Sequence, residues 1–270
     1  MAINFNQVPK YIRREIDPPE QVIEQGNRGN HVKQIQEWLN FHRCRTGVDA
    51  DFGPATRDCV KDFQNKSNLP ATGKVDVTTW HALVKPMTDA LLEPSNLSTM
   101  NVGAAVLAVA NQHVNQNPFE IGGANCGPWV RLYCEGHDGA QWAWCAGFVT
   151  FIMHQAYFYR DQKAPIKGSV SCDTLAAQAI AAGLFVNESD ITAGRVQWDS
   201  LGECGLFLRR RTSTDWTHTG FFHGGTEPVR ELVFSTIEGN TNDEGSREGF
   251  EACRRKRSVS KGDYDFIKFE

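Results

Sequence analysis

Long apolar runs are missing from this chain of 270 residues. No stretch reaches the roughly eighteen apolar residues that a membrane-spanning helix needs, so we expect no membrane partner. The first ten residues have neither a basic start nor an apolar core, so we expect no signal peptide. Low-complexity tracts and long internal repeats are also absent, which excludes fibrous and solenoid architectures.

Sequence features typical of nucleic-acid-binding proteins are weak as well. The net charge is −4, and neither a glycine-rich phosphate loop nor an aromatic ribonucleoprotein motif is present, so we expect no nucleic-acid partner. Two basic clusters, at residues 209–211 and 254–257, run against this trend. Both lie beside apolar residues in predicted strands, so we interpret them as solvated strand faces that could also approach an anionic glycan–peptide.

The eight cysteines include no Cys-x-x-Cys pair. Without a secretory signal their thiols should be reduced, and a zinc site has little support. Cys204 and His218 could share a metal with His223, but five residues separate the two histidines, which places them on opposite strand faces. Alternating Asp49 and Asp51 lack the glycine and late glutamate of a calcium loop. We therefore expect no metal and no cofactor.

What the chain does contain is a cysteine in a setting suited to catalysis. Cys145 lies in an apolar stretch whose residues at 148, 149, 152 and 156 have helical spacing, so we predict a buried helix with Cys145 in its first turn. The N–H groups and the positive dipole end of a helix start stabilise a thiolate and can hold an oxyanion. A free cysteine in an apolar run is more often a buried structural residue, so this reading depends on partners elsewhere.

Two predicted strands supply those partners. Residues 216–222 and 232–238 are predicted strands, and the intervening residues 223–231 are rich in turn formers. His218 lies in the first strand and Glu238 ends the second.

Antiparallel pairing of these strands would bring Glu238 or Asn240 beside one ring nitrogen of His218, and the other nitrogen would face Cys145. A thiol nucleophile needs a base within hydrogen-bond reach and a group that orients the base. The order along the chain, thiol then histidine then polar residue, meets this requirement. The remaining cysteines are expected to have structural roles only.

The C-terminal part of the chain resembles the CHAP family of cysteine- and histidine-dependent amidohydrolases/peptidases, relatives of the NlpC-type cell-wall peptidases. The resemblance rests on NCGPWVRLY at 125–133, WCAGFV at 144–149, HTGF at 218–221 and IEGNTN at 237–242. It implies a papain-like α+β fold, in which the helix carrying the cysteine packs on an antiparallel sheet. It also implies Cys145 as nucleophile, His218 as general base and Glu238 as the residue that orients the base. Asn240 would be a supporting polar group.

An oxyanion would form against the N–H of Cys145 and a second donor, for which Gln141 and Asn125 are the candidates. Several relatives have a proline just before the catalytic motif, where this chain has Ala143 and Trp144. This departure concerns only the shape of the entering loop.

The first ninety residues have a different pattern, typical of a small helical bundle. Three short helices are predicted: one after Gly29, one beginning at Pro54, and one capped by Asp76 or Thr78. Motifs HVKQIQ at 31–36, VDADFG at 48–53, VKDFQ at 60–64 and TTW at 78–80 resemble the peptidoglycan-binding-like three-helix domain. We predict this all-α domain at 1–87 (core about 26–85), a linker at 88–100 and the catalytic domain at 101–270.

Together these interpretations predict a peptidoglycan hydrolase that cleaves an amide bond of the wall peptide. The chain would be made in the cytoplasm and act on the cell wall, as a phage lysin released by holin machinery or as an antibacterial effector injected by a secretion machine. An effector would need an immunity protein in the producing cell. Two alternatives stay open: a non-catalytic wall-binding or phage structural protein with a dead papain-like domain, and a transglutaminase or deamidase on the same fold.

Overall fold

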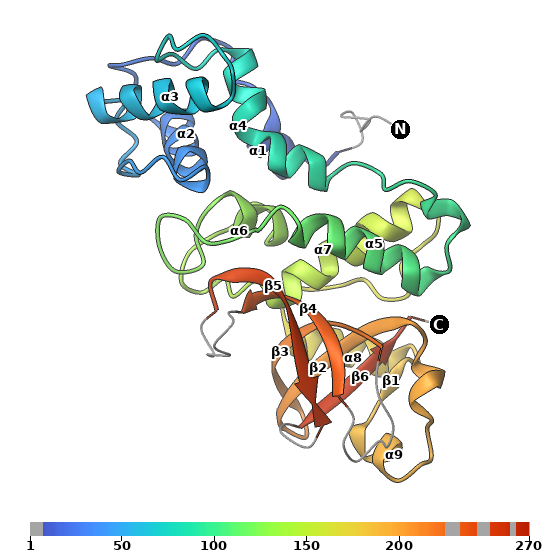
Figure 1. Ribbon diagram of the computed structural model, residues 1–270. Coiled ribbons are helices and arrows are strands. Elements are labelled where there is room, and N and C mark those ends of the chain that lie inside the picture. The colour runs from blue at the N-terminus through green and yellow to red at the C-terminus, as the bar shows by residue number, and fades with distance from the viewer. Residues whose placement is uncertain (1–7, 225–232, 242–248, 260–262, 270) are drawn as a thin grey trace. The chain divides into compact units, whose positions relative to one another are not determined.

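The chain divides into two compact units. Figure 1 shows its helices and strands in a computed structural model that describes residues 8–224, 233–241, 249–259 and 263–269. The helical unit comprises Ala2–Leu92 and Phe119–Gln141, and the sheet unit comprises Glu93–Pro118 and Trp142–Glu270. Residues 119–141 thus pack with the N-terminal helices although they belong to the predicted catalytic domain. The limits 1–87, 88–100 and 101–270 stay predictions.

The helical unit contains the three helices that the sequence predicts and two that it does not. Its helices are α1 (Lys10–Ile16), α2 (Asn30–Phe41), α3 (Pro54–Lys66), α4 (Val77–Ala90) and α6 (Pro128–Tyr133). Pro54 occupies the first position of α3, and the Asp76 carboxylate caps α4 by accepting a hydrogen bond from the Thr79 N–H at 2.8 Å. The core of the unit includes Trp38 and Trp80, both fully buried.

Two buried glutamines hold the turns of this unit in the same way. The Gln36 side chain donates to the Asp51 carbonyl at 3.0 Å and accepts from the Ala50 N–H at 2.9 Å. One helix later, Gln64 donates to the Lys74 carbonyl at 2.8 Å and accepts from the Gly73 N–H at 2.9 Å. Each amide replaces the water that the turn backbone would otherwise bind. The glutamines of the two sequence motifs are therefore structural residues.

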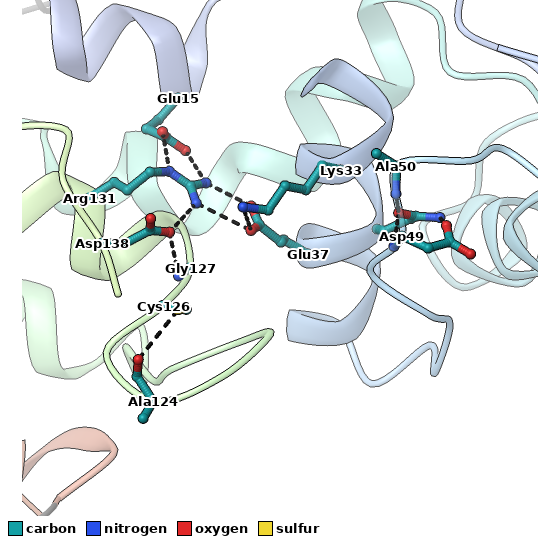
Figure 2. A network of polar contacts seen from close by, with 11 residues as sticks. Glu15, Lys33, Glu37, Asp49, Ala50, Ala124, Cys126, Gly127, Arg131 and Asp138 are labelled. Carbon is teal, nitrogen blue, oxygen red and sulfur yellow. Dashed lines mark hydrogen bonds and ion pairs between the residues drawn. The ribbon is translucent and has the colours of Figure 1, made fainter. Parts of the chain in front are cut away.

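A buried ion network joins residues 119–141 to the N-terminal helices (Figure 2). Arg131 of α6 binds both carboxylate oxygens of Glu15 on α1, at 2.7 and 2.9 Å. It also binds Glu37 on α2 at 2.7 and 3.2 Å, and Asp138 at 2.9 Å. Glu15 and Glu37 are 3% and 1% exposed. Because an unpaired buried carboxylate is costly, one guanidinium fixes α6 against both helices.

The sheet unit is an α+β fold, as the sequence predicts (Figure 1). Its helices are α5 (Val102–Val114), α7 (Cys145–Tyr159), α8 (Cys172–Ala181) and α9 (Glu188–Thr192), with short 3-10 helices η1 (Leu97–Thr99) and η2 (Trp198–Leu201). Its strands are β1 (Phe185–Val186), β2 (Cys204–Thr212), β3 (Asp215–His223), β4 (Val233–Thr241), β5 (Glu251–Ser258) and β6 (Tyr264–Lys268). The sheet order is β1-β6-β2-β3-β4-β5, and all neighbours run antiparallel.

The two faces of this sheet bury different residues. One face carries an aromatic cluster that includes Phe207, Phe222 and Phe234 and is covered by residues of α9 and η2. The other receives α7, whose Phe148 ring lies 6.2 Å from that of Phe221, edge to face. Gly239 of β4 permits this contact, since a Cβ there would lie 2.6 Å from a Phe148 ring carbon. The sheet therefore positions α7 closely over β3 and β4.

The predicted loop at residues 223–231 lies mostly outside the described residues, which stop at 224 and resume at 233. Within the described part of the chain, every helix is too short or too polar to cross a membrane.

Candidate active site

Cys145 is the first residue of α7. The helix follows from a run of apolar residues that are buried against the rest of the sheet unit, among them Phe148, Val149 and Ile152. The N–H groups of a first turn lack partners within their helix, so they and the helix dipole favour a negative charge on Cys145. Cys145 itself is 6% exposed, so it is a buried residue.

His218 comes from β3, at a point where the pairing with β2 is irregular. The register shifts between Arg209, which pairs with His218, and Arg210, which pairs with Trp216. The extra residue of β3 at this point is Thr217, and His218 keeps the regular alternation of the strand with Gly220 and Phe222. His218 lies close enough to Cys145 for each side chain to shift the pKa of the other. Its Nε2 lies 2.8 Å from Glu238 Oε2, which leaves Nδ1 for the thiol.

Glu238 on β4 is fully buried and has four polar contacts. Besides His218, it accepts hydrogen bonds from Arg257 Nε at 2.8 Å, Arg257 Nη2 at 2.5 Å and Thr236 Oγ1 at 2.5 Å. Gly220 of β3 leaves the space for it, because a Cβ there would lie 2.7 Å from Glu238 Cγ. The carboxylate is thus fixed on one side by a guanidinium and on the other by the ring that it orients.

These contacts shift the pKa values toward a thiolate–imidazolium pair. Burial alone would lower the pKa of His218, but its hydrogen bonds to Cys145 and Glu238, and their charges, raise it to about 9. A hydrogen bond from Cys172 is the largest cause that lowers the pKa of the Cys145 thiol. Burial opposes this, and the contact with His218 adds to the lowering, so the pKa lies well below its usual value.

Glu238 stays ionised in spite of its burial. Burial would raise its pKa, but the hydrogen bonds and charges of His218 and Arg257 hold the pKa well below its usual range. The site can therefore supply a nucleophilic thiolate, a proton on the neighbouring ring and a fixed anion behind that ring.

Two members of this site have no counterpart in the sequence-based prediction. Arg257 belongs to the basic cluster at 254–257 that we interpreted as a solvated strand face, and this interpretation is wrong for Arg257, whose side chain is 12% exposed. It pairs across the sheet with Phe234 of the aromatic cluster, so it shares the buried face. The alternation of side chains along a strand was the sequence signal that could have distinguished Arg257 from Arg254, because these two positions face opposite sides of the sheet.

Cys172, the second unpredicted member, is the first residue of α8. Its Sγ lies 3.9 Å from Cys145 Sγ. Cys172 therefore contacts the candidate nucleophile, whereas we expected every cysteine other than Cys145 to be only structural. No sequence spacing indicated this contact, since 27 residues separate the two thiols.

The supporting residues lie in different places. Asn240 is on β4, 7% exposed, with a positive φ of 51°. Asn125 and Gln141 belong to the helical unit, where the Asn125 amide donates to the Ala140 carbonyl at 3.1 Å. Their role as oxyanion donors stays a prediction. No three His, Cys, Asp or Glu side chains of the described residues are grouped so that they could hold a metal ion.

The helical unit has a pocket of its own, about 420 Å³ in volume. Its lining combines Arg43 and Arg45 with residues 119–122. The Arg43 guanidinium lies 4.7 Å from the centre of the Phe119 ring, and that ring stacks on Phe41 at 5.2 Å. Arg43 and Arg45 are exposed and suit a ligand that carries carboxylates, while Glu120 in the same lining offsets part of their positive charge.

Comparisons with known proteins cover the N-terminal part of the chain. Residues 28–83 match a family described as "Putative peptidoglycan binding domain". No curated protein matches the chain. Among solved structures the chain is similar to "The crystal structure of SleB N-terminal domain", with 36% sequence identity, a TM-score of 0.25, and coverage of 26% of this chain and 97% of that one. The match to the putative peptidoglycan binding domain spans α2, α3 and the first half of α4.

Proposed function

We propose that this protein is a cysteine-dependent peptidoglycan hydrolase with a papain-like catalytic unit of the CHAP type. The observation that carries the proposal is the chain of contacts from Cys145 through His218 to the buried Glu238, with 2.8 Å between ring nitrogen and carboxylate. Further support is the architecture, because the cysteine begins a helix that packs on the strands bearing the base and its partner.

The chemistry would proceed from the ion pair. The Cys145 thiolate attacks a peptide carbonyl, and the resulting oxyanion lies against the N–H groups at the start of α7. The His218 imidazolium donates its proton to the leaving amine, and Glu238 keeps the ring in place during this transfer. Water then attacks the thioester, with neutral His218 as its base, and the free thiolate returns.

The substrate class follows from the helical unit. Its peptidoglycan-binding domain supports peptidoglycan as a partner. The amide bonds of the wall peptide are then the substrates held near the thiolate, and the arginine-lined pocket would contact the carboxylates of the same polymer. Delivery as a phage lysin or as an injected effector remains compatible with this proposal.

The test is digestion of purified sacculi by the full chain, with mass spectrometry of the released fragments. Wild type should release fragments with new amine ends, and these identify the bond as muramoyl–alanine or stem peptide. Cys145→Ala should release none. Cys204→Ala is the matched control, since Cys204 is a buried cysteine of the same unit at 2% exposure, and it should keep turnover.

Other outcomes would replace the proposal. Equal fragment release by wild type and Cys145→Ala would remove the thiol from the mechanism. Ammonia release or amine incorporation without chain cleavage would indicate a deamidase or transglutaminase. Sacculus binding with no chemistry at all would indicate a dead catalytic unit on a wall-binding protein.

A further inference from the structure

Two thiols, and not one, lie at the centre of the sheet unit. Cys145 Sγ and Cys172 Sγ are 3.9 Å apart. Each cysteine is the first residue of a helix, of fifteen residues for α7 and ten for α8. Their exposed fractions are 6% and 7%, so both residues are buried but keep some contact with solvent. Hydrolysis uses the first thiol as nucleophile and gives the second no covalent role.

We propose that Cys145 and Cys172 form a peroxide-reactive dithiol that closes reversibly into a disulfide. A disulfide has an S–S length of about 2.05 Å, so the two sulfurs must approach by about 2 Å. The proposal requires this movement to come from rotation about the side-chain bonds of the two cysteines, which leaves both helix backbones in place. The dithiol chemistry stands by itself, and its regulatory consequence rests on the proposed hydrolase function.

The reaction has two steps and needs only hydrogen peroxide as oxidant. The Cys145 thiolate attacks one oxygen of the peroxide, an S–O bond forms, the O–O bond breaks, and hydroxide leaves and takes up a proton. Cys172 then loses its proton and its sulfur attacks the Cys145 sulfur. The S–S bond forms, the S–O bond breaks, and a second water leaves. The two thiols give up two electrons, and the peroxide is reduced to two waters.

The surroundings assign different roles to the two sulfurs. Cys145 faces His218 and accepts a hydrogen bond from Cys172, so it is the sulfur held as thiolate. The pKa of Cys172 is raised by its hydrogen bond to Cys145 and by burial, so Cys172 stays a thiol while its neighbour is charged. Once Cys145 becomes a neutral sulfenic acid, that charge is gone and Cys172 can ionise at the start of α8.

The consequence for the proposed hydrolase is a reversible off state. A disulfide removes the nucleophile from His218, so no acyl transfer can start. It also withholds Cys145 from further oxidation to sulfinic acid, which thiols cannot reverse. Exchange with a dithiol would restore both thiols and the ion pair.

The test uses the full chain, reduced and then freed of reductant, and exposed to hydrogen peroxide. Remaining thiols are blocked with an alkylating reagent, and the protein is digested without reduction and mapped by mass spectrometry. Wild type should lose two thiols and about 2 Da, with the loss in one linked pair of peptides carrying Cys145 and Cys172. Dithiothreitol should return both peptides to the thiol form.

Three variants sharpen the result. Cys172→Ser keeps a donor beside the Cys145 sulfur but cannot form the disulfide, so Cys145 should instead gain about 32 Da as sulfinic acid and resist dithiothreitol. Cys172→Ala should give the same product, which guards against a folding defect of one variant. Cys204→Ser, a buried cysteine whose pKa burial raises, should behave as wild type.

Conversion of wild-type Cys145 to sulfinic acid at the rate seen in Cys172→Ser, with no linked peptides, would overturn the proposal. So would a Cys145 that does not react. Both readouts are independent of peptidoglycan, so a linked pair in a protein that leaves sacculi intact would sustain the dithiol and reject the hydrolase.

Discussion

The pH dependence of Cys145 alkylation is the most direct measure of the proposed ion pair. In wild type we expect iodoacetamide to react with Cys145 from acidic pH upward, because the thiol pKa is held well below its usual value. The alkylation rate of Cys145 should change a second time near pH 9, where His218 loses its proton. Below that pH the imidazolium is present, and above it the thiolate loses its neighbouring cation.

The size of the effect follows from the ionised fraction. A thiol with an ordinary pKa of about 8.5 is only about 0.3% ionised at pH 6, so full ionisation of Cys145 would raise its thiolate fraction by about 300-fold. A less basic thiolate is less nucleophilic, and this reduces the gain in reaction rate by roughly an order of magnitude or more. We therefore expect about a 10-fold faster reaction at Cys145 than at an ordinary thiol of equal access at pH 6.

The assay is the alkylation rate against pH, with peptide mapping to locate the label. Cys126, a half-buried cysteine of the helical unit with a pKa raised by burial, is the internal comparison. His218→Ala should move the rise at Cys145 to the range of an ordinary thiol, and Glu238→Gln should move it less, because an amide oxygen still accepts from the ring. The accessibility of a thiol alters its absolute alkylation rate but not the pH at which that rate rises. An ordinary curve at wild-type Cys145, unchanged by His218→Ala, would refute the ion pair.

Three further outcomes are expected. Arg131→Met should lower the free energy of unfolding by about 3–5 kcal/mol in urea titrations, since it leaves the buried Glu15 unpaired and Glu37 with only Lys33 at 3.7 Å, and an unchanged midpoint would contradict this. Gly220→Ala should cost about 1–3 kcal/mol and abolish turnover, because its Cβ would displace Glu238, and full activity would show that the carboxylate can move aside. Arg43→Glu with Arg45→Glu should weaken sacculus binding several-fold in pull-down assays and leave turnover of soluble muropeptides unchanged, whereas equal binding would exclude the pocket.

The local features of the fold were predictable from the sequence. Pro54 and Asp76 mark helix starts by chemistry that acts within a few residues, and both helices begin where these residues predict. The strands bearing His218 and Glu238 follow from alternation and turn residues in the same way.

Long-range partners were not predictable in this way. Arg131 binds Glu15 and Glu37 across 116 and 94 residues, so composition alone gave no reason to group 119–141 with the first helices. The contact of Cys172 with Cys145 depends on two helix starts meeting in space, for which no spacing rule exists. Arg257 was hidden in a charged cluster that also contains the exposed residues Arg254 and Lys256, and exposure is the usual state of charged residues.

Arg257 also explains how the side chains of the site can be ionised although they are buried. From Arg257 through Glu238 and His218 to Cys145, the ion-pair form alternates positive and negative charges, so each ion has only opposite neighbours along the chain. The neutral thiol–imidazole form has the same net charge, and burial by itself would favour it. What reverses this preference is the hydrogen bond from Cys172, together with the ionised carboxylate behind the ring and the N–H groups at the start of α7. Arg257 is therefore a positioning residue that acts on the thiol through Glu238, because its guanidinium stabilises the ionised carboxylate in place of solvating water.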